Sequence, residues 1–409
     1  MIQIIYYILF TITLLYGLYF VITGLPALYF SKKNKIKKSK PKYKFAVLIA
    51  ARNEQEVIGS LVDSLNKQNY PKELYTTYVI VNNCTDNTAD VAKLKGATII
   101  NPTIKVKTKG DVLKYTFEKM IKENDMDAFI IFDADNVVDP NFISRMNDTL
   151  CAGYNVAEGF RDSKNLADNW LSGSYSLFYY IQNFFFNRAR MIMNLSGSIN
   201  GTGFMVKKEV IEKHGFNPKT LTEDIEFTAM CALNGEKIAF VEDAITYDEQ
   251  PTKFNDSWKQ RKRWSTGTLQ CMRHYNGKLL YHFFKDKNMS CLDMFMTFLA
   301  PIMQVLALIL TILLTVFSIV GIKLYDIFSY MLSYGIIFFI AVYIIGLIVN
   351  VCIFKYNKKK VLNIISSVFL FTVFMLTWLP INIVCMIKKN TKWEPIKHNR
   401  NVDVNELIQ

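Results

Sequence analysis

The sequence lacks both glycine-rich loops by which many proteins bind nucleotide phosphates. No G-x-G-x-x-G follows a predicted strand, and no G-K-[ST] occurs anywhere in the 409 residues. Such loops present backbone N–H groups to phosphate at a helix N-terminus, so their absence excludes the dinucleotide-binding and P-loop classes. A nucleotide bound by this chain needs a metal ion together with Lys or Arg side chains to neutralise its diphosphate.

Metal-binding cysteine and histidine patterns are also missing. The chain has seven Cys without any C-x-x-C spacing, and only four His scattered along its length. A structural zinc site requires clustered Cys and His ligands, so none is expected. Reduced thiols in a cytosolic domain account for the cysteines.

Charged residues are absent from long stretches at both ends of the chain. Ile2 to Phe30 contains none, and three further apolar segments follow in the last third, at Phe295 to Ile322, Met331 to Phe354 and Val361 to Ile387. Each exceeds the roughly 20 residues that cross a bilayer as a helix. The sequence therefore predicts an N-terminal transmembrane anchor over residues 1–30 and a membrane region over residues 289–387.

Lysines follow the first apolar segment directly, at positions 32, 33, 35, 37 and 38. The positive-inside rule puts this cluster and residues 31–288 in the cytosol and predicts a multi-pass protein of the plasma membrane. The formal net charge of +13 suits anionic membrane lipids, and because the lysines lie beside apolar spans we expect no nucleic-acid partner. Three C-terminal spans would put the basic tail, residues 388–409, outside, against that rule. Phe295 to Gln304 is the best candidate for an interfacial segment, and the side of the tail stays open.

The middle of the chain alternates short apolar runs with helical patterns. Phe45 to Ala50, Tyr78 to Val81 and Ala128 to Phe132 read as buried strands, each followed by a polar loop. Helical periodicity resumes after the first two loops and also precedes the third strand. This order predicts an α/β fold with a mostly parallel sheet and a ligand site along its carboxyl edge.

Two aspartates follow the third of these strands. Asp133 and Asp135 stand at alternate positions, and in an extended chain such positions project to the same side. Carboxylates are suitable ligands for a hard divalent cation, Mg²⁺ or Mn²⁺, or for the phosphates that it carries. A D-x-D pair alone is equally typical of a solvated strand end, so its meaning depends on the other motifs.

Three other polar groups have both a structural and a functional interpretation. Lys109, beside Gly110, is either a phosphate or base contact or a solvated lysine. Gly201-Thr202-Gly203 either lets the backbone approach a ligand or forms a plain turn. Thr222-Glu223-Asp224 precedes a helical stretch, where acidic residues often only cap the helix. Alternatively, the helix dipole keeps Asp224 ionised, so that Asp224 can accept a proton.

The segment from Trp258 to Trp264 is predicted to be helical. Its spacing puts Gln260, Arg263 and Trp264 on one face. An arginine fork binds phosphate and an indole face stacks on sugar rings. A basic amphipathic helix on the bilayer surface explains the same residues, and such a helix could also roof an active site.

Together and in this order, the motifs resemble the membrane-integrated family 2 glycosyltransferases, which include cellulose, chitin, hyaluronan and poly-N-acetylglucosamine synthases. The resemblance implies a GT-A-like nucleotide-sugar-binding domain with Asp224 as catalytic base. It assigns the metal to Asp135 and Asp133 and the rest of the donor to Ala51, Asn53, Glu54, Asn82, Asp86 and Lys109. It assigns the acceptor and diphosphate to Gly201, Thr202, Gly203, Thr222, Glu223, Gln260, Arg263 and Trp264.

One position departs from the family pattern. Asn82, followed by Asn83, stands where the family usually has an aspartate. An amide oxygen still accepts a hydrogen bond from a base N–H, so nucleotide binding is expected with an altered preference.

The expected reaction is an inverting transfer of a hexose or N-acetylhexosamine from a UDP-sugar, dependent on Mg²⁺ or Mn²⁺. The first expectation for the acceptor is a growing polysaccharide that the spans export, with or without an accessory protein. The alternative is a membrane lipid that receives a single sugar. A transporter or channel with a cytosolic regulatory domain is disfavoured, because the apolar segments carry almost no charged residues.

Overall fold

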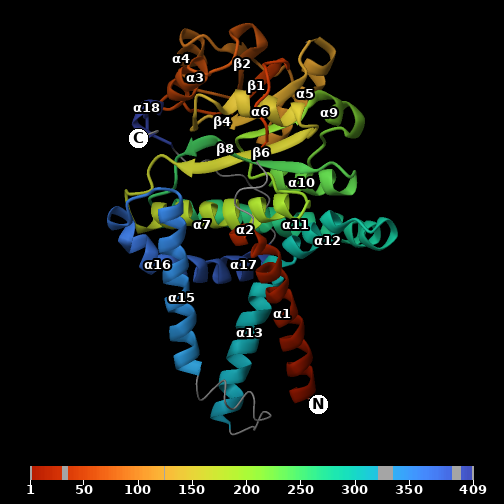
Figure 1. Cartoon of the computed structure of the whole chain (residues 1–409), viewed down its shortest axis with the longest axis vertical. Helices are drawn as coiled ribbons and strands as arrows, with labels where there is room; N and C mark the ends of the chain where they lie inside the picture. Colours follow the sequence, from red (N-terminus) through yellow and green to blue (C-terminus); the bar gives the residue numbers. More distant parts are fainter. Residues whose placement is uncertain (1, 30–35, 124, 321–334, 389–397, 408–409) are drawn as a thin grey trace.

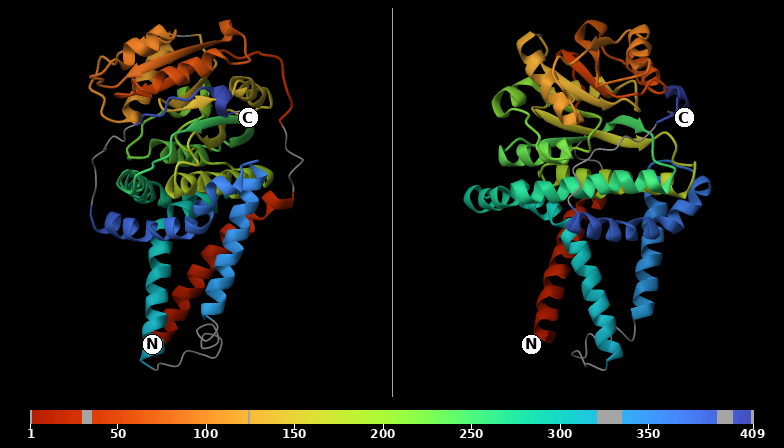
Figure 2. Two further views of the ribbon diagram at one scale, coloured as in Figure 1. Left: turned by 90° about the vertical axis from the view of Figure 1, so that its left-hand side faces the viewer. Right: turned by 180° about the vertical axis from the view of Figure 1, so that it is seen from behind.

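The structure is a computed structural model that describes residues 2–29, 36–123, 125–320, 335–388 and 398–407. Its parts form three tiers (Figure 1). A sheet domain lies at one end, a layer of helices runs across the middle, and three long helices extend from that layer away from the sheet. Figure 2 shows the same tiers from two other sides.

The described strands form one eight-stranded mixed sheet in the order β3-β2-β1-β4-β7-β6-β8-β5. The pairs β1 with β2, β1 with β4, β2 with β3 and β6 with β8 are parallel, whereas β7 and β5 run antiparallel to their neighbours. The predicted α/β fold with a mostly parallel sheet is thus confirmed. The strands are β1 (Phe45–Ala51), β2 (Tyr75–Val81), β3 (Thr98–Ile100), β4 (Ala128–Asp133), β5 (Val137–Val138), β6 (Val156–Ser163), β7 (Phe204–Lys207) and β8 (Ile238–Asp248).

Helices cover both faces of this sheet because its central strands are apolar on both sides. Along β1, Val47 and Ile49 face one hydrophobic cluster, whereas Ala46 and Leu48 face another. The first cluster includes α3 (Ile58–Asn66) and α6 (Phe142–Cys151). The second includes α5 (Lys109–Glu123), α9 (Lys208–His214) and α10 (Glu223–Leu233). α4 (Thr88–Leu94) packs beside α3.

The middle layer, which we call the platform, consists of α7 (Trp170–Ile181), α11 (Phe254–Asp286), α12 (Met289–Phe298), α16 (Ile365–Leu376) and α17 (Trp378–Ile387). α7 continues as a π-helix over Gln182–Arg188 and then as α8 (Ala189–Ile192). Tyr175 of α7 packs on Phe374 of α16, so aromatic residues join α7 to the C-terminal helices.

The third tier contains α1 (Ile2–Gly24), α13 (Ala300–Ile319) and α15 (Gly335–Tyr356); the short α2 (Pro26–Tyr29) follows α1. By length and composition, three described segments could cross a membrane: 3–28, 300–317 and 365–387. The last of these is α16 and α17, which run along the platform, across the direction of α13 and not parallel to it (Figures 1 and 2). Apolar composition alone therefore does not distinguish the helices of the two lower tiers.

A helix break at Leu299 divides Phe295 to Gln304, our candidate for an interfacial segment. Phe295 lies in the last turn of α12, which ends at Phe298 in the platform, whereas Gln304 belongs to the first turns of α13. Asn382 of α17 donates a hydrogen bond to Gln304 Oε1 at 2.7 Å. That amide pair explains the polar residue in an otherwise apolar helix.

A buried ion pair fastens α1 to the platform. Arg190 of α8 donates from Nε and Nη2 to the two carboxylate oxygens of Asp293 in α12, at 3.1 and 3.0 Å. From α1, the Tyr19 hydroxyl donates to Asp293 at 2.7 Å and Thr23 accepts from Arg190 at 3.1 Å. Both charged side chains are at most 5% exposed. We call this group the anchor cluster.

Candidate active site

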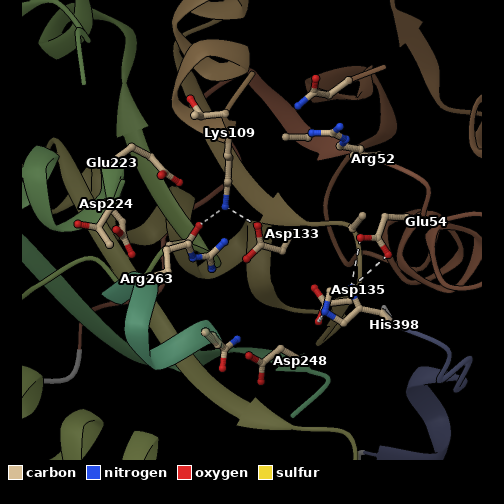
Figure 3. A pocket seen from close by; sticks show the side chains of 18 of the residues that line it. Arg52, Glu54, Lys109, Asp133, Asp135, Glu223, Asp224, Asp248, Arg263 and His398 are labelled. Carbon is tan, nitrogen blue, oxygen red and sulfur yellow. Dashed lines mark hydrogen bonds and ion pairs between the residues drawn. The ribbon is translucent and has the colours of Figure 1, made fainter. Parts of the chain in front are cut away.

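A pocket opens at the carboxyl ends of β1, β2 and β4 and is closed from below by α10 and α11 (Figure 3). Most of the residues that the sequence motifs single out line it, although they come from seven separate parts of the chain. They are Ala51, Glu54, Asn82, Lys109, Asp133, Asp135, Gly201, Thr222, Glu223, Asp224, Gln260, Arg263 and Trp264.

The two aspartates of the D-x-D motif do not face the same partner. β4 ends at Asp133, and the chain then turns, with the Asn136 N–H donating to the Asp133 carbonyl at 3.2 Å. Asp133 meets Lys109, whereas Asp135 accepts from the Glu249 N–H at 3.1 Å and lies beside His398 (Figure 3). The argument from strand alternation is therefore wrong, because Asp135 lies in a turn beyond the strand.

Lys109 lies between the acidic groups of the pocket. Its Nζ forms a short ion pair with Asp133 and donates to the Gly201 carbonyl at 2.6 Å. Burial alone lowers the pKa of Lys109, but the nearby carboxylates of Asp133 and Glu223 outweigh it and raise the pKa above its usual value. The lysine is thus a fixed positive charge at the centre of the pocket, positioned by the first turn of α5.

Glu223 and Asp224 form the first turn of α10, as the sequence predicts. Burial raises the pKa of Asp224, and burial followed by repulsion from Asp224 raises that of Glu223 to about 7. Asp224 Oδ2 lies against Gly201, where a Cβ atom would approach it to 3.0 Å, and φ is +91°. A glycine at position 201 therefore leaves room for a buried carboxylate that can accept a proton.

Gln260, Arg263 and Trp264 enter the pocket from α11. Trp264 stacks on Trp378 of α17, with ring centroids 6.1 Å apart and planes at 24°. The edges of Tyr175 and Tyr179 in α7 pack against the same indole. The lower wall of the pocket is thus continuous with the aromatic core of the platform.

Four residues that the resemblance assigns to binding do not line the pocket. Asn53 accepts from the Thr85 N–H at 2.8 Å and Asp86 accepts from the Thr88 N–H at 3.1 Å, so both shape the loops after β1 and β2. The Thr202 hydroxyl accepts from the Asp133 N–H at 2.9 Å. Gly203 packs against Thr246 beneath the motif. In each case a local hydrogen bond or close packing holds the residue away from the cavity.

His398 belongs to the segment interpreted mainly as a basic tail and was not among the predicted site residues. Its Nδ1 lies 3.2 Å from both carboxylate oxygens of Glu54, and its Nε2 lies 4.0 Å from Asp135 Oδ2. Burial alone lowers the pKa of His398, but Asp135 and Glu54 raise it to about 10. No local pattern could have found this residue, because its partners lie about 260 and 340 positions earlier.

Arg161 and Asp248 also line the pocket without having been predicted. Arg161 Nε donates to Asp248 Oδ2 at 2.6 Å, Nη1 donates to the Asn200 carbonyl at 2.7 Å, and the guanidinium lies 4.0 Å above the Tyr179 ring. All its contacts are formed within the protein. Arg161 is therefore a rigid part of the wall below Asp135.

The residues around Asp135 suit a divalent cation that also binds substrate. Asp135 and His398 supply one carboxylate and one imidazole about a single point, with Glu54 and Asp133 nearby. Within the described ranges, no group of three or more Asp, Glu, His or Cys side chains forms a complete cage. Mg²⁺ is commonly held by one or two carboxylates plus phosphate oxygens and water, so an incomplete protein shell fits such an ion.

Comparison with known proteins agrees with this geometry. The family model described as "Glycosyltransferase like family 2" matches residues 41–267. The mannosyltransferase PcManGT from Pyrobaculum calidifontis, solved with GDP-Man and Mn²⁺, shares the fold with a TM-score of 0.62 at 14% identity, over 95% of this chain and 99% of that one. The protein is thus a glycosyltransferase with a GT-A-like fold. It belongs to glycosyltransferase family 2.

The curated relatives match only part of this chain, and only part of their own length. The probable glycosyltransferase YdaM of Bacillus subtilis is 28% identical over 260 residues, which are 60% of this chain and 59% of YdaM. The β-monoglucosyldiacylglycerol synthase of Synechocystis is 24% identical over 231 residues, which are 55% of this chain and 47% of that enzyme. The chain thus matches about half the length of these relatives.

Proposed function

We propose that this protein is an inverting glycosyltransferase that takes a hexose or N-acetylhexosamine from a UDP-sugar and transfers it to an acceptor at the membrane surface. The observation that carries the proposal is a pocket that brings two kinds of group together. It holds Asp133 and Asp135 with His398, and it also holds the buried carboxylate of Asp224, with Trp264 in the same lining. The first suits a diphosphate with its cation, and the second suits a sugar hydroxyl.

In this mechanism Asp224 accepts the proton of the acceptor hydroxyl, which attacks the anomeric carbon of the donor in line. Lys109 and Arg263 supply positive charge to the departing diphosphate. Asp135 and His398 would hold Mg²⁺ or Mn²⁺, which when bound neutralises charge on the same group. Only one carboxylate acts on the sugar, because inversion requires no covalent intermediate with the enzyme.

A growing polysaccharide is the first candidate for the acceptor. The aromatic wall formed by Trp264, Trp378 and Tyr179 leads from the pocket into the platform, and sugar rings stack well on such faces. Export of the product along the neighbouring spans would follow from this position, alone or with an accessory protein.

A membrane lipid that receives one sugar is the second candidate, and a specific observation favours it. Three of the curated relatives, from cyanobacteria, are named β-monoglucosyldiacylglycerol synthases. The platform below the pocket carries exposed apolar side chains such as Phe369 and Val373 of α16, which suit contact with a lipid surface.

We also propose a topology for the membrane region in which α1, α13 and α15 cross the bilayer and α16 with α17 lies in its surface. Two contacts support it. Lys359, just after α15, pairs with Asp162 of β6 at 2.8 Å, and His398, after α17, pairs with Glu54. Both ends of residues 365–387 thus contact the catalytic domain. This arrangement puts residues 36–288 and the basic tail in the cytosol of a plasma-membrane protein, in agreement with the positive-inside rule.

The test is release of nucleotide by the purified chain in detergent, with a panel of UDP-sugars, GDP-mannose as a further donor, and Mg²⁺ or Mn²⁺. UDP release with a polymer ladder supports the polysaccharide synthase, and UDP release with one sugar on an added lipid extract supports the glycolipid enzyme. Release from GDP-mannose alone would overturn the assignment of the donor. No release from any donor, with either acceptor and either metal, would contradict the proposed activity.

A further inference from the structure

The described C-terminal residues 398–407 lie along the catalytic domain and do not extend from the platform. We call this segment the clasp. It begins at His398 in the pocket and ends in the short helix α18 (Val404–Leu407) on the outside of the sheet domain (Figure 1). Sequence analysis expected only a polar, basic tail here.

The clasp is fixed to the domain at several points. The backbone N–H groups of Asn399 and Arg400 donate to the Glu249 carboxylate, at 3.2 and 2.9 Å for its Oε2. The Arg400 guanidinium pairs with Asp168 at 2.8 Å, and Asp403 pairs with Lys67, just after α3, at 2.6 Å. These contacts hold residues 399–403 on the domain next to the pocket.

An apolar side chain anchors the far end of the clasp. Val404 is 2% exposed and packs with Val137 of β5 and Tyr247 of β8, and Leu407 packs against the same group. Both strands lie next to pocket residues: β5 follows Asp135 by two positions, and β8 runs into Asp248 and Glu249. Val404 therefore packs on the small part of the sheet, β5 and the end of β8, that adjoins the pocket.

Glu249 links the clasp to the D-x-D motif directly. Its carboxylate accepts from the clasp backbone, while its own N–H donates to Asp135 Oδ2 at 3.1 Å. A displacement of the clasp would thus remove His398 from the pocket. It would also free the Glu249 side chain, whose backbone N–H donates to Asp135.

We propose that the clasp is a positioning element for the cation site and that Val404, through its anchor, sets the affinity of that site for Mn²⁺. The inference rests on the cation site of the proposed function. Without the anchor, His398 lies on a flexible end and contributes little to binding, because holding it near Asp135 then costs conformational entropy. Metal ligands generally depend on such outer contacts, and their loss weakens metal affinity about 10- to 100-fold.

The experiment compares Mn²⁺ binding to the full chain in detergent, measured by electron paramagnetic resonance, for the parent and for Val404→Asp. We expect the variant to bind Mn²⁺ about 10- to 100-fold more weakly, close to His398→Ala, and Arg400 to become a site of rapid tryptic cleavage. Asn405→Asp is the matched control, since Asn405 is exposed on the same helix. It should bind Mn²⁺ like the parent and keep Arg400 protected.

Parental Mn²⁺ affinity together with a protected Arg400 in Val404→Asp would overturn the proposal. If Val404→Asp unfolds, Asp403→Lys, which repels Lys67 without disturbing the apolar anchor, replaces it with the same expected direction and the same overturning result. Because binding is measured without donor or acceptor, a parent that binds Mn²⁺ but transfers no sugar would contradict the proposed function and leave the test of the clasp intact. A parent that binds no Mn²⁺ even when UDP is added would overturn both.

Discussion

The pocket and the anchor cluster both pair a cation with carboxylates, but they differ in whether those partners can be exchanged. In the anchor cluster, Arg190 and Asp293 are 1% and 5% exposed and are joined by two hydrogen bonds. In the pocket, Lys109 and Asp133 are 20% and 37% exposed and face open space. The first arrangement fixes two elements together, whereas the second leaves room for phosphate oxygens to replace a carboxylate as partner.

Burial alone does not identify a charged group that acts in function. The anchor cluster is the more deeply buried of the two, but its groups are saturated by partners from three elements. The pocket carboxylates include several whose pKa is raised by burial. An incompletely paired charged group is therefore a better indication of a catalytic or binding site than a charged group that is merely buried.

The largest effect should come from replacing Asp224, the proposed base in the pocket. Asp224→Asn retains the shape of the side chain but cannot accept a proton at neutral pH. We expect turnover to fall about 10²- to 10⁴-fold, the usual contribution of a general base, with donor binding nearly unchanged. Nucleotide release and donor affinity, measured on the same preparation, check this, and a variant with parental turnover would end the assignment.

In the anchor cluster, Arg190→Met should reduce stability without a comparable effect on chemistry. It leaves Asp293 buried without its partner, which destabilises proteins by about 3–5 kcal/mol. Thermal unfolding in detergent measures the loss, and turnover per folded molecule should stay close to the parent. The double variant Arg190→Met, Asp293→Leu should regain part of the stability. A stable single variant with lost turnover would show that the two regions are not separable.

The pH dependence of activity should follow the pocket. Asp224 must be ionised to act, and burial raises its pKa, so kcat/KM should increase as pH rises through weakly acidic values and level off above the pKa. Glu223→Gln removes a neighbouring negative charge, which should move this limb to lower pH. A profile without a limb that rises from acidic pH would contradict the role of Asp224.

The smallest effect should come from an ion pair that belongs to neither region. Lys95 and Asp63 are 2.7 Å apart, but both side chains are at least 40% exposed. Exposed pairs contribute less than about 1 kcal/mol. Lys95→Met should thus leave the unfolding temperature and turnover almost unchanged, and a loss comparable to that of Arg190→Met would remove the distinction drawn from burial and saturation.

Sequence patterns predicted the parallel half of the sheet best. Runs such as Phe45 to Ala50 are apolar on both faces, and each leads into a polar loop, so strand, loop and shared edge follow from local rules. The second half contains β7, β6 and β8, whose pairing depends on contacts distant in the chain. Its antiparallel insertion between β4 and β6 has no local signal.

The site was predictable where motifs fall at strand or helix ends and unpredictable elsewhere. Glu223 and Asp224 are at the start of a helix, as expected, and Lys109 begins another. Asp135 has other partners than Asp133 because β4 ends at Asp133, two residues before it. His398 and Arg161 could not be found, since their partners are brought close only by the tertiary fold.

Residues 365–387 have a consequence for how the protein is made. Their hydrophobicity would favour release into the bilayer as a span by the insertion machinery, yet in the proposed topology both flanks remain on the cytosolic side. Packing of α16 on α7 and of α17 on α11 is then what keeps this segment at the surface. The catalytic domain would therefore have to fold before the segment reaches its final orientation, so that a soluble folding event decides a membrane topology.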